Sequence, residues 1–289
     1  MSAWLQLTRI ALLPTLLWDG IAGAFLSGSW QESSFGFALL CGALIYHGGM
    51  VLNDVADASL DREHRPNRPL VRGAISRPLA LAVGLLMQFA ALCLAWFSFH
   101  PEGWKLVAFL VMLVLVYDFG GPLIRKSAGP VLLALARATS LFLPAAAAWG
   151  FRESLSSELL CWTAFSYAIY FLFLSRLATL EEQGAAGMRA LQYLVAAGMV
   201  PFGLVHLSGG LWVGIAWLLW AAMLLPAGFR DRHIFWSPER VQAAVRQSLS
   251  LAPWILGMAL LLSETPWLAA LAPAVSLLVT TLARRFAPE

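Results

Sequence analysis

FGFALLCGALIYHGGMVLNDVADASLD, residues 35–61, joins an uncharged apolar run to a group of acidic residues. Residues 35–52 contain no Asp, Glu, Lys or Arg. A helix needs about 20 mostly apolar residues to cross a hydrocarbon core of about 30 Å. The stretch therefore predicts a transmembrane helix that carries an amide and several carboxylates at its end.

The composition of the whole chain extends this prediction to a polytopic membrane protein. Of 289 residues, 60% are hydrophobic and 12% are charged, and the mean hydropathy is +0.74. A soluble domain has about 25% charged residues, so this chain has too few charges to cover a water-soluble surface. A soluble globular protein, a disordered chain and a nucleic-acid-binding protein are therefore excluded. The three cysteines lie in apolar stretches and have neither metal-site spacing nor a disulfide pattern.

Ten apolar stretches are candidates for membrane spans. We expect an all-α, polytopic transmembrane helical bundle that forms a single domain over residues 1–289. The stretches cover residues 10–28, 35–53, 79–98, 104–117, 130–150, 159–175, 190–208, 210–228, 247–263 and 266–283.

The basic residues divide unequally between alternate loops. If the N-terminus is cytoplasmic, 16 of the 19 Lys and Arg residues fall in cytoplasmic segments and two, Lys105 and Arg152, fall outside. Such an excess is the positive-inside signal. It predicts that both termini and the polar loops, and hence the functional site, face the cytoplasm.

The group at the end of the second stretch has the spacing of a metal site. If the helix continues, Asn53, Asp57 and Asp61 lie at i, i+4 and i+8 on one face, with Asp54 about 100° away. Like charges at this spacing repel, so a cation must compensate them. Mg²⁺ binds one or two carboxylates together with substrate phosphates. The pattern therefore favours a magnesium site over an ordinary solvated helix end.

A basic loop follows the carboxylates. Arg65, Arg68 and Arg72 alternate there with Pro66 and Pro69, and proline restricts the backbone. Guanidinium groups bind phosphate bidentately, so the loop is a candidate phosphate site. The alternative is that these arginines, like Lys126 later in the chain, only set the membrane orientation.

Residues 53–76 carry a resemblance to a known family. Asn-Asp-x-x-Asp-x-x-x-Asp, followed by Arg-Pro-x-Arg-Pro-Leu-x-x-Gly-x-Ile-Ser, resembles the first motif of the UbiA superfamily of intramembrane prenyltransferases. Arg9 before the first span and the segment from Tyr117 to Lys126 agree with that family, although Asp118 replaces the usual Ser or Thr. The segment 47–54 is most similar to the UbiA-like proteins of bacterial ebo gene clusters, which implies a bacterial inner membrane.

The resemblance implies a fold and an activity. The family usually has nine spans around a central cavity that opens to the cytoplasmic face, so we expect nine to ten. It uses Mg²⁺ to transfer an isoprenoid group from a prenyl diphosphate to a small-molecule or lipid acceptor. By the same resemblance, Asn53, Asp57 and Asp61 bind metal and act in catalysis. The residues expected to bind substrate are Asp54, Arg65, Arg68, Tyr117 and Lys126.

The family's second motif is degenerate in this chain. Its three Asp positions, aligned on residues 185–187, hold Arg176, Thr179 and Gln183. Three interpretations remain open: Glu181 or Glu182 supplies a substitute metal ligand, Arg176 replaces the second ion beside the diphosphate, or the protein is a non-catalytic lipid or metabolite carrier.

Three further polar residues lie inside the predicted spans. Asp19 and Arg137 are costly in a membrane unless they are paired or face a cavity, and they would either bind substrate or join helices. An ion-coupled transporter would use such charges beside discontinuous helices, which the sequence does not indicate. His47 has no metal-ligand spacing, so we expect it to form a hydrogen bond within the helix packing.

Overall fold

The chain folds almost entirely into helices, which confirms the all-α prediction. The computed structural model describes residues 3–201, 203–204 and 210–286. The α-helices are α1 (Ala3–Leu7), α2 (Leu13–Ser27), α3 (Phe35–Asp57), α4 (Asp61–His64), α5 (Arg77–Ser98), α6 (Trp104–Phe119), α7 (Gly121–Ser127), α8 (Gly129–Ser140), α9 (Leu143–Trp149), α10 (Phe151–Ser154), α11 (Glu158–Ala178), α12 (Gly187–Met199), α14 (Leu211–Leu224), α15 (Pro226–Arg230), α16 (Pro238–Leu251), α17 (Pro253–Leu260) and α18 (Leu271–Phe286).

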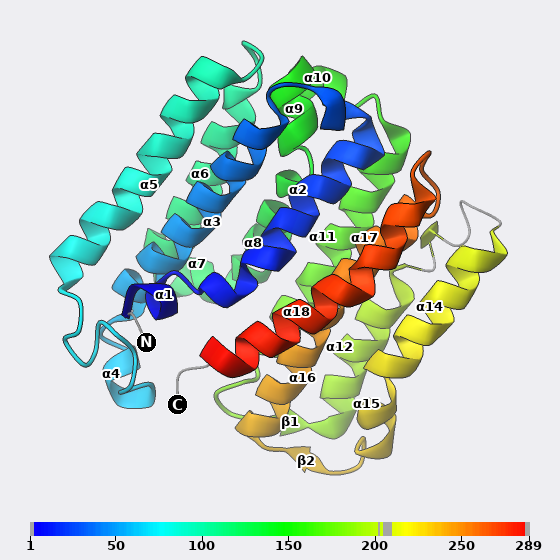
Figure 1. The fold of residues 1–289 in the computed structure, drawn as a ribbon. Helices are drawn as coiled ribbons and strands as arrows, with labels where there is room; N and C mark the ends of the chain where they lie inside the picture. Colours follow the sequence, from blue (N-terminus) through cyan, green and yellow to red (C-terminus); the bar gives the residue numbers. More distant parts are fainter. Residues whose placement is uncertain (1–2, 202, 205–209, 287–289) are drawn as a thin grey trace.

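Short elements complete the fold. Three 3-10 helices, η1 (Ile10–Leu12), η2 (Ser29–Gln31) and η3 (Pro266–Ala270), precede or follow longer helices. The strands β1 (Ala185–Ala186) and β2 (Phe235–Trp236) pair in antiparallel fashion. In Figure 1, α1, α4, the β1–β2 pair and the last turn of α18 lie at the same end of the bundle.

Two helices organise the bundle. Helix α3 packs against α2, α5, α6 and α9, and helix α11 packs against α8, α12, α16 and α17. Helix α2 contacts α3, α9, α11, α17 and α18, so it connects the two groups. Figure 1 shows α18 crossing the face of the bundle beside α2 and α17. Helices α2 and α18 therefore lie next to each other, although they are far apart in sequence.

Four helical segments of the described chain are long and apolar enough to cross a membrane. They are Ile10–Ser27, α3, α5 and α11, and the count rises to six if the bent pairs α6–α7 and α8–α9 each form one span. Helix α14 and the segment Pro266–Leu282 are apolar but shorter. The seventh predicted stretch, 190–208, is partly outside the described residues. The count of nine to ten spans stays a prediction.

Two helix pairs are sharply bent, although the sequence does not indicate discontinuous helices. Helices α6 and α7 meet at 112°, and α8 and α9 meet at 50°. Proline stands in the first turn of the second helix of each pair, at Pro122 and Pro144, and also opens α17 at Pro253. Proline is favoured in a first helical turn and cannot donate the hydrogen bond of a helix interior. Prolines inside apolar stretches therefore start new helices here.

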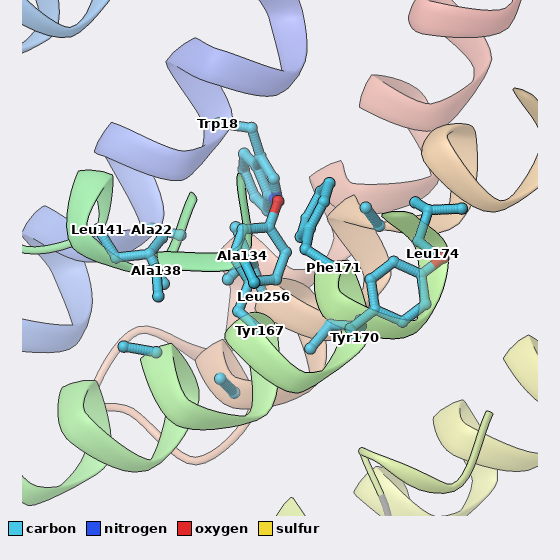
Figure 2. Close-up of a cluster of buried hydrophobic side chains, with 14 of the residues drawn as sticks. Trp18, Ala22, Ala134, Ala138, Leu141, Tyr167, Tyr170, Phe171, Leu174 and Leu256 are labelled. Carbon is cyan, nitrogen blue, oxygen red and sulfur yellow. The ribbon is translucent and has the colours of Figure 1, made fainter. Parts of the chain in front are cut away.

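One part of the largest hydrophobic core lies where α2, α8, α11 and α17 meet. Figure 2 shows Trp18, Tyr167, Phe171 and Leu256 converging there. The Trp18 indole donates a buried hydrogen bond of 3.0 Å to the Pro253 carbonyl, which joins α2 to α17. This core holds the helices that carry the polar residues described next.

Helix α2 also closes on the break between α8 and α9. A Cβ atom on Gly23 would lie 2.0 Å from the Leu141 carbonyl oxygen, so only glycine fits this contact. The backbone of α2 thereby reaches the bend of the α8–α9 span.

Candidate functional site

The acidic segment does not form one continuous helix. Helix α3 ends at Asp57, a turn covers residues 58–60, and Asp61 begins α4. The condition that the helix continues is therefore met for Asn53 and Asp57, which lie one turn apart on α3, and it is not met for Asp61. A continuous helix would place the carboxylates of Asp57 and Asp61 on adjacent turns, where they repel. The turn separates them, and each carboxylate has its own arginine partner.

Arg68 joins two of the carboxylates. Its Nη1 lies 3.0 Å from Asp54 Oδ1 and 2.5 Å from Asp61 Oδ2, and both carboxylates are buried. Burial raises the pKa of the Asp61 carboxyl above its ordinary value, and the Arg68 guanidinium opposes this shift. The basic loop thus folds back onto the acidic segment and neutralises it.

Arg9 reaches the same carboxylate from the N-terminal segment. Its Nη2 donates a hydrogen bond of 3.2 Å to Asp54 Oδ1. Arg9 has φ 51° and ψ 48°, and it is the one non-glycine residue with positive φ among those that the structure describes. Asp54 Oδ1 consequently accepts hydrogen bonds from two arginines, Arg9 and Arg68.

Arg125 approaches the third carboxylate, Asp57. The two side chains form an ion pair, and both are about one-fifth exposed (21% and 20%). Arg125 also donates hydrogen bonds of 3.0 Å to the carbonyls of Tyr117 and Asp118, and its guanidinium lies 5.5 Å from the centre of the Tyr117 ring. A cation at the carbonyl end of a helix interacts favourably with the helix dipole. The α6–α7 bend, with Gly121 at φ 85°, directs Arg125 back onto the end of α6.

Asp118 is a member of the site that sequence reasoning did not select. It is buried, its Oδ1 accepts a hydrogen bond of 3.2 Å from Asn53 Nδ2, and its Oδ2 has no hydrogen-bond partner in the structure. Its Oδ1 lies 3.9 Å from Arg125 Nη2. The available signal was the Asp itself, which stands where the resembling family has Ser or Thr.

The oxygen donors of this group fit Mg²⁺ that is shared with a diphosphate. Asn53 supplies an amide oxygen, Asp57 a partly exposed carboxylate, and Asp118 a buried oxygen that lacks a partner. In the described part of the chain, no three His, Cys, Asp or Glu side chains form a group that could hold a metal alone. Mg²⁺ commonly uses one or two carboxylates and completes its shell with water and phosphate oxygens. Asp61 follows the turn at the start of α4 and is paired with Arg68.

The remaining residues predicted to bind substrate have different surroundings. Tyr117 is partly buried beside Arg125 and Gly129. Arg65 is partly buried and close enough to Asp61 and Glu181 to act on both electrostatically. Lys126 is exposed and makes no hydrogen bond or ion pair to any described residue. The residue before it, Arg125, makes the contact with the acidic segment.

The degenerate second motif faces the arginines of the first. Glu181 is half-buried, and burial raises the pKa of its carboxyl, whereas Arg65, Arg246 and Arg9 lower it. Glu182 is exposed. Arg176, in the last turn of α11, is partly buried, and no described residue forms an ion pair with it. Of these residues, Glu181 interacts electrostatically with Arg9 and Arg65, and Arg176 has no ion-pair partner among the described residues.

Asp19 and Arg137 pair with each other inside the bundle. Arg137 Nη1 lies 3.0 Å from Asp19 Oδ2, and the Tyr167 hydroxyl donates to Asp19 Oδ1 at 2.7 Å. Arg137 Nη2 donates to the same hydroxyl at 3.2 Å, and the guanidinium stacks 4.7 Å from the centre of the Phe171 ring. Of the two predicted roles, the geometry favours joining helices, because the pair connects α2 to α8.

Comparison with known sequences identifies related proteins. The model of the UbiA prenyltransferase family matches residues 12–287. The digeranylgeranylglyceryl phosphate synthase of Pyrococcus abyssi is 39% identical over 80 residues, which cover 27% of this chain and 29% of that protein. The synthase of the same name from Sulfolobus acidocaldarius is 28% identical over 150 residues, covering 49% and 51%. The matches thus span about half, or less, of these relatives' length.

Solved structures share the fold. The apo structure of a UbiA homologue from Aeropyrum pernix K1 has a TM-score of 0.66 at 18% identity, covering 88% of this chain and 98% of that one. A UbiA homologue from Archaeoglobus fulgidus bound to GPP and Mg²⁺ has a TM-score of 0.54 at 16% identity, covering 98% and 88%. At these identities the likeness establishes a shared helical fold.

Proposed function

Because this chain belongs to the UbiA prenyltransferase family, we propose that it is a Mg²⁺-dependent intramembrane prenyltransferase. It moves an isoprenoid group from an allylic prenyl diphosphate to a small-molecule or lipid acceptor. One observation carries the proposal: Asn53, Asp57 and Asp118 lie in one polar group, in which Asn53 Nδ2 donates to Asp118 Oδ1 and Arg125 contacts both carboxylates. The fold relative that binds GPP and Mg²⁺, and relatives named as synthases of a prenylated glyceryl phosphate, support it.

The proposed reaction breaks one bond and forms another. The C1–O bond of the allylic diphosphate breaks, both of its electrons leave with the diphosphate, and the acceptor's nucleophile bonds to C1 and loses its proton. Mg²⁺, when bound, neutralises the diphosphate and polarises the breaking bond. Asn53 and Asp57 would hold the ion, with Asp61 and Asp118 beside them. Arg125 and Arg68 would then exchange their carboxylate partners for diphosphate oxygens, which guanidinium groups bind bidentately.

We propose that arginines replace the second ion of the family. Asp positions of the second motif hold Arg176 and two neutral residues, and Arg176 has no ion-pair partner among the described residues. Arg9 and Arg65 act electrostatically on the adjacent Glu181. The guanidinium groups of these arginines would thus supply the positive charge that a second Mg²⁺ supplies in the family. Glu181 and Glu182 would remain outside the metal shell.

The proposal also places the protein in the membrane. We propose one domain with nine to ten crossings, in which α12, α14, α16–α17 and α18 supply crossings beyond the long apolar helices. The charge distribution of the loops supports a cytoplasmic site and cytoplasmic termini. The resemblance of the segment 47–54 supports membership of the subgroup encoded in bacterial ebo gene clusters. Such membership would place the protein in a bacterial inner membrane.

The second candidate function is a carrier that binds a prenyl diphosphate or lipid without turnover. The missing acidic residues of the second motif favour it. The deciding experiment incubates the purified protein with geranyl, farnesyl and geranylgeranyl diphosphates and measures released diphosphate. We expect release with Mg²⁺ and its loss with EDTA. Donor binding without release, even after a cell extract is added to supply acceptors, would contradict the transferase and favour the carrier.

Arg125 and Lys126 provide a matched test of which cation serves the site. We expect Arg125→Gln to weaken donor binding about tenfold or more, since it removes a charged hydrogen-bonding group from the centre of the site. Lys126→Gln should change binding less than threefold, because the exposed Lys126 acts only through screened charge. The measurement is the KM for geranyl diphosphate. A larger increase in KM for Lys126→Gln than for Arg125→Gln would assign the contact with the diphosphate to Lys126, as the family resemblance implies.

A further inference from the structure

We propose that His47 is a positioning residue for Arg9: it fixes the left-handed backbone turn that directs the Arg9 guanidinium to Asp54. The inference rests on the proposed function, in which the arginines around the acidic segment receive the donor diphosphate. It adds a residue from the interior of α3 that touches neither the diphosphate nor the proposed metal.

The N-terminal segment is attached to the site at several points. Leu7 is fully buried against Val51 and Val55 of α3, and Gln6 Oε1 accepts a hydrogen bond of 3.0 Å from Arg72 of the basic loop. Arg9 then reaches across to Asp54. The segment is thus part of the wall of the site.

The peptide group between Thr8 and Arg9 is held at both of its polar atoms. His47 Nδ1 lies 2.7 Å from the Thr8 carbonyl oxygen, and the Arg9 N–H donates to the Gln6 carbonyl at 3.1 Å. Because a carbonyl oxygen only accepts, Nδ1 carries the proton. The orientation of this peptide plane about the Arg9 N–Cα bond is the φ angle of Arg9. The hydrogen bond from His47 therefore acts directly on that angle.

The turn at Arg9 needs such support. An L-residue in the left-handed region places its Cβ close to a neighbouring carbonyl oxygen, and arginine has no local hydrogen bond that compensates, as Asn or Asp does. If the Thr8 carbonyl were released, the backbone would relax to the ordinary region. That rotation would redirect the Arg9 side chain away from Asp54.

Nothing else in the described structure explains a histidine at position 47. Its other ring nitrogen, Nε2, is buried without a hydrogen-bond partner, and its ring makes an edge contact with Tyr46 that phenylalanine could also make. A buried polar atom without a partner is costly. The hydrogen bond to Thr8 is the one polar interaction that His47 makes in the described part of the chain.

The test is a double-mutant cycle on the full-length protein. We would measure the dissociation constant for inorganic diphosphate with Mg²⁺ and the KM for geranyl diphosphate in wild type, His47→Phe, Arg9→Ala and the double variant. Arg9→Ala should weaken diphosphate binding about tenfold, as expected for losing a charged hydrogen-bonding partner. His47→Phe should weaken it severalfold in the wild-type background and have no effect when Arg9 is already Ala.

A conservative variant supplies the matched control. His47→Asn keeps an N–H donor near the position of Nδ1, so it should retain most of the wild-type affinity, whereas His47→Phe keeps the ring but loses the donor. If His47→Phe does not fold, His47→Leu takes its place. Equal effects of the His47 variant in both backgrounds, or no effect in either, would overturn the inference. A wild-type protein that neither binds nor releases diphosphate would instead overturn the proposed function.

Discussion

Asp57→Asn is expected to reduce Mg²⁺-dependent diphosphate release by about two to three orders of magnitude. The change preserves the shape of the side chain and removes the partly exposed carboxylate that faces Arg125. Removing one preorganised group that stabilises charge in a transition state costs about 10²–10³ in rate. Here the loss would include the metal that the carboxylate holds. The measurement is the initial rate of diphosphate release from geranyl diphosphate at saturating Mg²⁺.

Two controls make the result specific. Asp57→Asn should unfold at nearly the wild-type temperature, since Arg125 keeps its hydrogen bonds to two carbonyls. Glu181→Gln should change the rate less than about threefold, because arginines take the place of a second ion in our proposal. A loss in Glu181→Gln equal to that in Asp57→Asn would restore Glu181 as a metal ligand. A wild-type rate in Asp57→Asn would remove Asp57 from catalysis.

Arg137→Met is expected to destabilise the fold by about 3–5 kcal/mol, the usual cost of leaving a buried charge without its partner. Asp19 is 1% exposed and lies within the predicted first span, so water cannot replace Arg137. The variant also removes the guanidinium from the faces of Phe171 and Tyr167. The fraction of protein that remains monodisperse in detergent after heating would report the loss.

The partner substitution separates charge from packing. Asp19→Leu combined with Arg137→Met removes both charges, and replacing a whole buried pair by apolar residues is often neutral or stabilising. We therefore expect the double variant to recover most of the stability that Arg137→Met loses. If the double variant were as unstable as Arg137→Met, the role of Arg137 would be to fill space. Single variants as stable as wild type would show that the pair is open to water.

The local features of the site could be predicted from sequence, and the distant contacts could not. An uncharged run followed by Asn53, Asp54 and Asp57 is visible at helical spacing, because neighbouring turns of one helix fix it. The contact of Arg125 with Asp57 spans 68 residues. It depends on the bend between α6 and α7, for which Pro122 was the available signal. Lys126 and Arg125 are adjacent in sequence, and only the bend determines which of them faces the acidic segment.

The helical class could be predicted because it depends on composition and not on distant contacts. The breaks between helices could not be predicted. Composition decides between a membrane bundle and a soluble protein, whatever the tertiary structure. A proline such as Pro144 inside an apolar run is compatible with a kinked span or with two helices. At the break between α8 and α9, Gly23 of α2 packs against the Leu141 carbonyl. No local sequence pattern reveals this contact.

The pairing of Asp19 with Arg137 has a consequence for the insertion of the protein into the membrane during synthesis. Ribosomes add about 5–20 residues per second, so α2 emerges about ten seconds before α8. During that interval the first span must enter the bilayer with a carboxyl group that has no cationic partner in the chain. An ionised Asp at the centre of a span costs about 2.5–3.5 kcal/mol for insertion. The order of synthesis thus makes the insertion of α2 less favourable until α8 arrives and completes the pair.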